Sequence, residues 1–319
     1  MKLTNKYILS IFSASSILFM SSIDAYAGFP LKGQDGNSIV QSPSVPASVT
    51  FAGNKIDLDR VDMYERLDRE LTAMSYTHGN TLLLLKRANK YFPEIIPILK
   101  KQGVPEDIIY LACIESTLNP RAYSAAKAAG LWQFIPSTAK HYGLEVNEFV
   151  DERYNTEKAT VAACRYLKDA YKKYGNWESV AASYNGGMAR ITKELAAQGA
   201  TTAYDLYLVD ETSRYMFRLL AMKLIMENPR EYGFTLQSDQ LYQPVRTENV
   251  EVNTPVEDWP RWAKEHGISF MTLREYNPWI RAKSLPNKTG KTYTVKIPNK
   301  EDLKRSTQKK IIYNKNWVY

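Results

Sequence analysis

Apolar residues recur at helical spacing along most of the stretch from Asp57 to about Gly233. In segments such as VDMYERLDRELTAMSY and TEKATVAACRYLKDAYKKYG they fall at positions i, i+3, i+4 and i+7, which line one face of an α-helix. Helix signals separate the segments, since Gly103 ends one and Pro105, with Glu106 in the first turn, begins the next. The pattern predicts an all-α domain over residues 57–235.

The composition changes after this domain. The short β-branched runs RTENVEVNTP and KTYTVKIP flank WPRWAKEHG and FMTLREYNPWI, which predicts a small strand-helix-helix-strand module over residues 245–298. Residues 299–319 form a basic tail whose state the pattern leaves open. We therefore expect a mainly α protein with a small α+β module at its carboxyl end.

The amino terminus has the pattern of a secretory signal peptide over residues 1–27. Lys2 and Lys6 precede an apolar run from Tyr7 to Met20, and the small-x-small site Ala25-Tyr26-Ala27 predicts cleavage before Gly28. A membrane anchor is the alternative, but the apolar run is short and interrupted by serines. We expect export to the periplasm or cell envelope. No cysteine lies near the cleavage site, so lipidation there is not expected.

Charge and composition limit the classes of partner that we expect for the chain. Cleavage would lower the formal charge from +8 to +7, which suits an anionic polymer such as a cell wall, or a membrane surface. Nucleic acid is not expected, because the chain is exported and lacks a basic-aromatic recognition motif. Residues 28–56 are rich in Gly, Pro and Ser without periodicity, so we expect an extended linker there, and a monomer overall.

The cysteines and histidines give no pattern of a metal site, and only the cysteines raise the question of a disulfide. Cys113 and Cys164 fit an oxidising compartment if they pair, but both lie in apolar helical runs, so two buried thiols are the alternative. The three histidines, His78, His141 and His266, are scattered without ligand spacing. We predict no metal site and no cofactor.

One carboxylate stands out in the helical domain. Glu115 continues the apolar face that Ile108, Leu111 and Ala112 set on a helix starting near Pro105. Apolar surroundings and the negative end of a helix both disfavour an ionised carboxylate, so this position suits a proton donor. On base rates alone a solvated glutamate at a frayed helix end is the more common reading.

The neighbours of this glutamate overturn that reading, because four motifs resemble those of lytic transglycosylases with a soluble-lytic-transglycosylase, lysozyme-like domain. The resemblance covers residues 83–232 and is strongest to the membrane-bound lytic transglycosylase D branch. In order, the motifs are Glu115-Ser116, Ser124-x-Ala126-x-Ala128-x-Gly130-Leu131-Trp132-Gln133-Phe134, Tyr184-Asn185-Gly186-Gly187, and Glu211-Thr212-x-x-Tyr215.

The resemblance implies cleavage of the β-1,4 bond between N-acetylmuramic acid and N-acetylglucosamine in peptidoglycan, with a 1,6-anhydromuramic end as the product. Most glycosidases use two carboxylates, and substrate-assisted enzymes are an exception. In this family Glu115 would act as acid and then as base, assisted by the substrate's N-acetyl group. A hydrolytic lysozyme on the same fold and a wall-binding protein without activity are the alternatives.

Other motif residues are expected to bind the sugar. Gln133 and Asn185 offer amide groups to N-acetyl and hydroxyl groups, while Tyr184 and Tyr215 offer a flat apolar face with one polar end. Ser116 is placed to hydrogen-bond the sugar or the neighbouring glutamate. Phe134 completes the set of expected substrate-binding residues.

Three positions in this region receive other readings. Lys127 stands where Gly is common in the family, and Ser183 replaces the usual Ala; neither change removes a chemical group. Lys127 is expected to alter the loop shape or to present a cation to peptide carboxylates. Asp151-Glu152-Arg153 is expected to be a structural turn, since transglycosylation needs no second carboxylate.

The carboxyl-terminal module is similar to LysM modules, which bind glycans containing N-acetylglucosamine. The opening Gly-Asp-Thr-Leu of that family is missing here, so glycan binding by the module stays open, with a packing role as the alternative. Trp259, Trp262 and Trp279 would form either a core or a sugar platform. The matching segments are Trp262-Ala263, His266-Gly267-Ile268-Ser269, Leu273, Asn277-Pro278, Gly290, Tyr293, Val295 and Ile297-Pro298.

Overall fold

A computed structural model describes residues 31–32, 38–39 and 41–319 of the chain. The expected signal peptide, residues 1–27, lies outside the described residues. Within them, β1 (Leu31–Lys32) and β2 (Ser38–Ile39) form a short antiparallel pair. None of the helices in the described part of the chain is both long and apolar enough to span a membrane.

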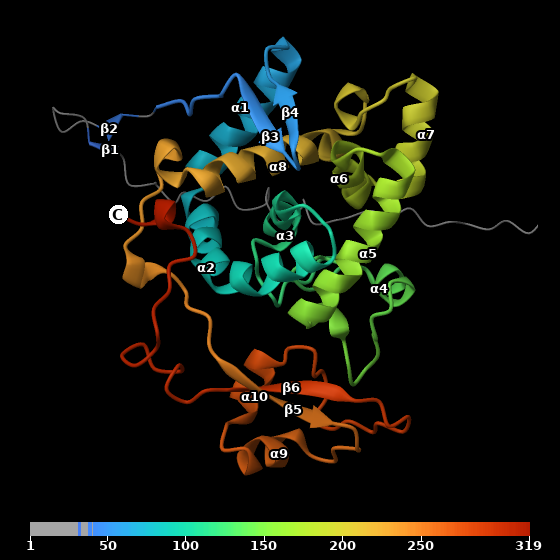
Figure 1. Cartoon of the computed structure of the whole chain (residues 1–319), viewed down its shortest axis with the longest axis vertical. Helices are drawn as coiled ribbons and strands as arrows, with labels where there is room; N and C mark the ends of the chain where they lie inside the picture. The colour runs from blue at the N-terminus through green and yellow to red at the C-terminus, as the bar shows by residue number, and fades with distance from the viewer. Residues whose placement is uncertain (1–30, 33–37, 40) are drawn as a thin grey trace, which may run out of the picture.

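Helices dominate the body of the molecule, as the periodicity predicts (Figure 1). The mainly α fold class is confirmed. The helices of this domain are α1 (Val61–Tyr76), α2 (His78–Lys101), α3 (Ile109–Ser116), α4 (Pro136–His141), α5 (Thr156–Tyr174), α6 (Trp177–Gly186), α7 (Met188–Gln198) and α8 (Asp210–Glu227).

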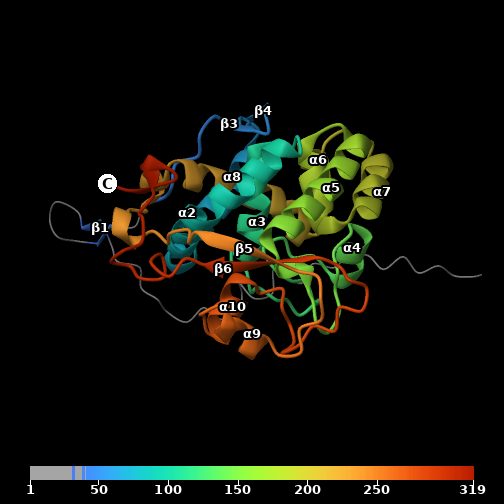
Figure 2. The same cartoon turned by 60° about the horizontal axis from the view of Figure 1, so that its bottom comes forward.

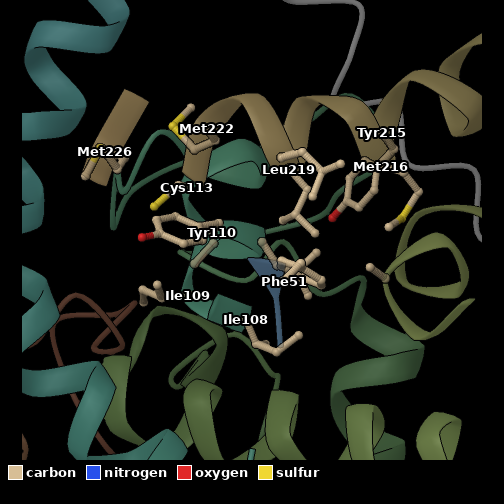
Figure 3. Packing of buried hydrophobic residues seen from close by; sticks show 14 of the residues in the cluster. Phe51, Ile108, Ile109, Tyr110, Cys113, Tyr215, Met216, Leu219, Met222 and Met226 are labelled. Carbon is tan, nitrogen blue, oxygen red and sulfur yellow. The ribbon is translucent and has the colours of Figure 1, made fainter. Parts of the chain in front are cut away.

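Helix α3 lies at the centre of this domain, and seven of its eight residues are buried. A helix that is apolar on all sides is stable only when other elements surround it. Helix α8 covers one side, where Leu219 and Met222 lie over Tyr110 and Cys113 (Figure 3). Each large apolar side chain buried in this way contributes about 1.5–3 kcal/mol. The short central helix is therefore held rigidly by its surroundings.

The expected linker over residues 28–56 is corrected for its last part. The strands β3 (Ser48–Phe51) and β4 (Asn54–Asp57) pair as an antiparallel hairpin. Val49, Phe51 and Ile56 are buried in the main core, and the backbone N–H of Ala52 at the turn donates to Asp107 Oδ2 at 2.7 Å. Alternating apolar residues give the hairpin one buried face, a pattern too short to stand out from the Pro/Ser-rich surroundings.

The carboxyl-terminal module has the predicted element order. It comprises β5 (Thr247–Val252), α9 (Trp259–Glu265), α10 (Phe270–Tyr276) and β6 (Tyr293–Pro298), with β5 and β6 antiparallel. The module packs beneath the helical domain (Figure 2) and shares its core with Ala129, Val150 and Tyr154 of that domain. Trp259 is fully buried and Trp279 is nearly so, so these two form core and not platform.

The basic tail packs back onto the helical domain. Trp317 is buried, and its Nε1 donates to the carbonyl oxygen of Met226 at 2.6 Å. Its ring meets that of Phe92 edge-on, with centroids 5.7 Å apart. Trp317 is therefore part of the main core, an outcome that the charged composition of the tail did not indicate.

Both cysteines are buried and free. Burial raises the pKa of Cys164 to about 11 and that of Cys113 well above its usual value. Of the two possibilities that the sequence left open, the structure has two buried thiols.

Candidate active site

Glu115 lies at the end of the central helix α3, and its side chain is buried, with 9% of the residue exposed. The chain turns sharply after it, because Thr117 and Leu118 adopt φ values of 52° and 50°. Arg87 of α2 fixes this turn by donating from Nη1 to the carbonyl oxygen of Thr117 at 2.9 Å. The predicted burial of the carboxylate among apolar residues is confirmed.

Tyr215 of α8 holds the carboxylate directly. Its hydroxyl donates to Glu115 Oε1 at 2.7 Å. Burial, and then the charge of Glu115, raise the pKa of the Tyr215 hydroxyl well above its usual value, so the hydroxyl keeps its proton and remains a donor. A hydrogen bond to one carboxylate oxygen fixes the direction of the other.

The Gly-Leu-Trp-Gln segment is tied by hydrogen bonds to helices α3, α5 and α6. Ser116 Oγ lies 2.9 Å from the carbonyl oxygen of Leu131. The indole N–H of Trp132 donates to Thr160 Oγ1 on α5 at 2.9 Å, and the Tyr184 hydroxyl on α6 donates to the Trp132 carbonyl at 2.7 Å. These contacts place the segment beside Glu115 and use the hydroxyls of Ser116 and Tyr184 for its positioning.

The last residue of that segment, Gln133, is half-buried and has a left-handed backbone, with φ at 48°. Its Nε2 donates to the carbonyl oxygen of Gly130 at 2.8 Å, so the amide is held within its own loop. Asn185 is buried on α6 next to Tyr184. Phe134 is also buried, with its ring centroid 6.1 Å from that of Tyr184, so its contacts are those of a packing residue.

Arg153 holds both ends of this loop, an interaction that no sequence pattern predicted. Arg153 Nη1 donates to the carbonyl oxygens of Lys127 at 2.6 Å and Phe134 at 3.0 Å, one at each end of the loop. Asp151 pairs with the guanidinium at 2.7 Å, and both side chains are buried. A Cβ added to Gly130 would lie 2.0 Å from the Arg153 carbonyl oxygen. The expected turn therefore also positions the loop that carries Gln133.

The two departures from the family pattern fit this architecture. Lys127 is exposed and has φ at 63°, a region that favours glycine and explains the usual Gly at this place. Ser183 is fully buried, and its hydroxyl donates to the Val180 carbonyl oxygen at 2.7 Å. In the described ranges no group of three His, Cys, Asp or Glu residues is arranged to hold a metal ion.

Comparison with known families assigns both parts of the chain. Residues 92–206 match the transglycosylase SLT domain, and residues 248–301 match the soluble lytic transglycosylase C-terminal LysM-like domain. The chain belongs to the lytic transglycosylase family, with an SLT domain followed by a LysM-like domain.

Individual relatives agree with this assignment. The chain is 32% identical over 276 residues to membrane-bound lytic murein transglycosylase D of Escherichia coli K12, covering 83% of this chain and 58% of that protein. It is 25% identical over 194 residues to membrane-bound lytic murein transglycosylase C of Haemophilus ducreyi, covering 52% of this chain and 51% of that one. The chain thus spans somewhat over half the length of these relatives.

Solved structures show a weaker likeness. The 70 kDa soluble lytic transglycosylase of Escherichia coli is similar with a TM-score of 0.40 and 19% identity, over 50% of this chain and 30% of that chain. Its complex with bulgecin A gives a TM-score of 0.39 at 20% identity, over 49% and 29% of the two chains. The assignment of the family therefore rests on the sequence matches.

Proposed function

We propose that the protein is a peptidoglycan lytic transglycosylase that cleaves the bond between N-acetylmuramic acid and N-acetylglucosamine. The observation that carries the proposal is the placement of Glu115: a buried carboxylate at the end of α3, held by the Tyr215 hydroxyl, inside a domain of the SLT family. Both named relatives are murein transglycosylases, and murein is peptidoglycan.

The proposed reaction uses Glu115 twice. Protonated Glu115 first gives its proton to the glycosidic oxygen, the bond from this oxygen to C1 of the muramic residue breaks, and N-acetylglucosamine leaves with a free 4-hydroxyl. The muramic N-acetyl oxygen stabilises C1 in the meantime. The C6 hydroxyl then bonds to C1 and loses its proton to Glu115. The 1,6-anhydro ring forms, no water is consumed, and the acid is regenerated.

The surrounding residues orient these partners. Tyr215 directs the carboxylate, and the loop held by Ser116, Tyr184 and Arg153 presents Gln133 to the sugar. Asn185 completes the sugar-binding wall in this proposal, and Phe134 packs against Tyr184 behind it. The signal-peptide pattern of residues 1–27 supports action in the periplasm or cell envelope, and the proposed reaction needs no cofactor.

The experiment is the digestion of purified sacculi by the wild type and by Glu115→Gln. Gln keeps the shape and polarity of Glu but cannot deliver the proton, so release of 1,6-anhydromuropeptides should fall at least about 1,000-fold. Glu106→Gln, at an exposed carboxylate, is the matched control and should behave as the wild type. Persistent anhydro products from Glu115→Gln would defeat the assignment. Reducing ends from the wild type would instead indicate a lysozyme, and binding without release a wall-binding protein.

A further inference from the structure

A pocket of about 480 Å³ lies where α2, residues 239–243 and residues 305–310 of the tail meet. Its walls carry four cationic side chains, Lys86, Lys90, Arg305 and Lys310. The volume is within the range of pockets that bind small ligands. The pocket shares none of its lining residues with the Glu115 site.

Its framework is fixed by one buried residue. Asn89 on α2 is fully buried, and its Nδ2 donates to the carbonyl oxygens of Tyr242 at 3.0 Å and Ile311 at 3.1 Å. Its Oδ1 accepts from the backbone N–H of Tyr313 at 2.8 Å. The helix, the connecting segment and the tail are thus locked together beneath the pocket, so the cations project from a rigid frame.

The charges of the pocket are poorly balanced. Its one carboxylate, Asp239, lies 3.6 Å from Arg305. Lys86 and Lys310 form no ion pair with any residue that the structure describes. Lys86 and Lys90 are one helical turn apart, a spacing at which like charges destabilise a helix.

Lys90 adds a desolvated cation. Its ammonium lies 5.4 Å from the ring centroid of Tyr91 and 5.9 Å from that of Tyr276. Burial lowers the pKa of Lys90, with only partial compensation from Glu275 and Glu94. An anion in the pocket would restore the lost solvation and relieve the repulsion between the lysines.

We propose that this pocket is a second substrate-binding site, which takes a carboxylate of the peptide substituents on the glycan strand. The inference rests on the proposed function, because a peptidoglycan strand carries such peptides on its muramic residues. Arg87, next to Lys86 on α2, contacts the turn directly after Glu115, so α2 connects the pocket with the cleavage site. The site would favour strands that carry peptides over bare strands.

The test is a double variant, Lys86→Gln/Lys310→Gln, prepared with and without Glu115→Gln. Lys55→Gln/Lys193→Gln, at two exposed lysines outside the pocket, is the control with the same change of net charge. The KM is measured on strands with peptides and on strands stripped by an amidase. The wild type and control should have a KM about 3- to 10-fold lower on peptide-bearing strands, and the pocket variant should lose this preference.

Co-sedimentation of the Glu115→Gln forms with sacculi measures the contribution of the pocket to binding even if no cleavage occurs. If the proposed function is wrong, the wild type releases no anhydro products. This outcome is distinct from the loss of the pocket's role, which is judged from binding alone. Equal binding of the pocket variant and its control to peptide-bearing sacculi would overturn the inference. Competition by inorganic phosphate but not by the free peptide would also overturn it, and would identify a phosphate site.

Discussion

Tyr215 contacts Glu115 directly through its hydroxyl. Its removal by Tyr215→Phe deletes the 2.7 Å hydrogen bond and leaves the ring in its packed position. We expect kcat on glycan strands to fall about 10- to 100-fold, because the carboxylate loses its orientation. Tyr64→Phe, at an exposed tyrosine, should leave kcat unchanged. An unaltered kcat in Tyr215→Phe would show that the carboxylate is oriented by other groups.

Lys127 carries backbone strain that glycine would relieve. Its φ of 63° destabilises the folded state by roughly 1–2 kcal/mol for a lysine. Glycine would remove this strain, but its greater entropy in the unfolded chain would offset part of the gain in stability. Lys127→Gly should therefore raise the free energy of unfolding by about 0.5–1 kcal/mol in urea denaturation. Lys140→Gly, in helix α4, should lower it by about as much, since glycine is a poor helix former. A destabilised Lys127→Gly would contradict the account of this loop.

At this scale the sequence predicted the burial of Glu115 but not the contacts of the other motif residues. The motif register and the helical face of Glu115 predicted its burial. The engagement of the Ser116 and Tyr184 hydroxyls with backbone carbonyls could not be predicted, because those contacts join residues 15 and 52 positions apart. The clamp by Arg153 spans 19 and 26 positions and has no local pattern at all.

The loop between Ser124 and Phe134 is the element whose shape the site depends on. Gly130→Ala puts a methyl group 2.0 Å from the Arg153 carbonyl oxygen at a φ of 75°. We expect a loss of about 2–4 kcal/mol in unfolding free energy and a large loss of activity, because backbone must move. Gly199→Ala is the control: its φ is 63° but nothing lies near, so about 1 kcal/mol should be lost and activity kept.

The helices and strands differ in how strongly the sequence pattern predicts them. Helices α1, α2, α5 and α8 are 16 residues or longer, and their repeated periodicity predicts them well. The β3–β4 hairpin has four residues per strand, too few to separate alternation from chance. The docking of the tail through Trp317 depends on a hydrophobic site built by distant helices, which a local reading cannot detect.

Ion pairs connect the carboxyl-terminal module with the helical domain. Lys291 of the module lies 2.6 Å from Glu145 and 3.1 Å from Glu152, and Lys158 pairs with Glu152 at 2.6 Å. Burial alone would raise the pKa of Glu152, but hydrogen bonds from Lys158 and from the backbone of Glu145 outweigh it and lower the pKa below its usual value. The folded protein therefore favours the ionised form.

This linkage predicts an acid-sensitive structure. A lowered folded-state pKa gives stability that is present above the unfolded pKa and is lost as pH falls through the folded pKa. Glu152→Gln should be about 1–3 kcal/mol less stable than the wild type at pH 7. This difference should shrink as the pH falls below about 4.5, as measured by thermal or urea unfolding across pH. A difference that is constant down to pH 2 would contradict the role of the Glu152 charge.

In the proposed reaction, C1 of the muramic residue bonds to the C6 hydroxyl of the same sugar and not to water, with Glu115 as acid and then base. The mass of the muropeptides released from sacculi by the wild type tests it most directly. We expect products lighter by one water than those of a hydrolytic muramidase, and none of them from Glu115→Gln. Products that carry the extra water, as reducing muramic ends, would contradict it.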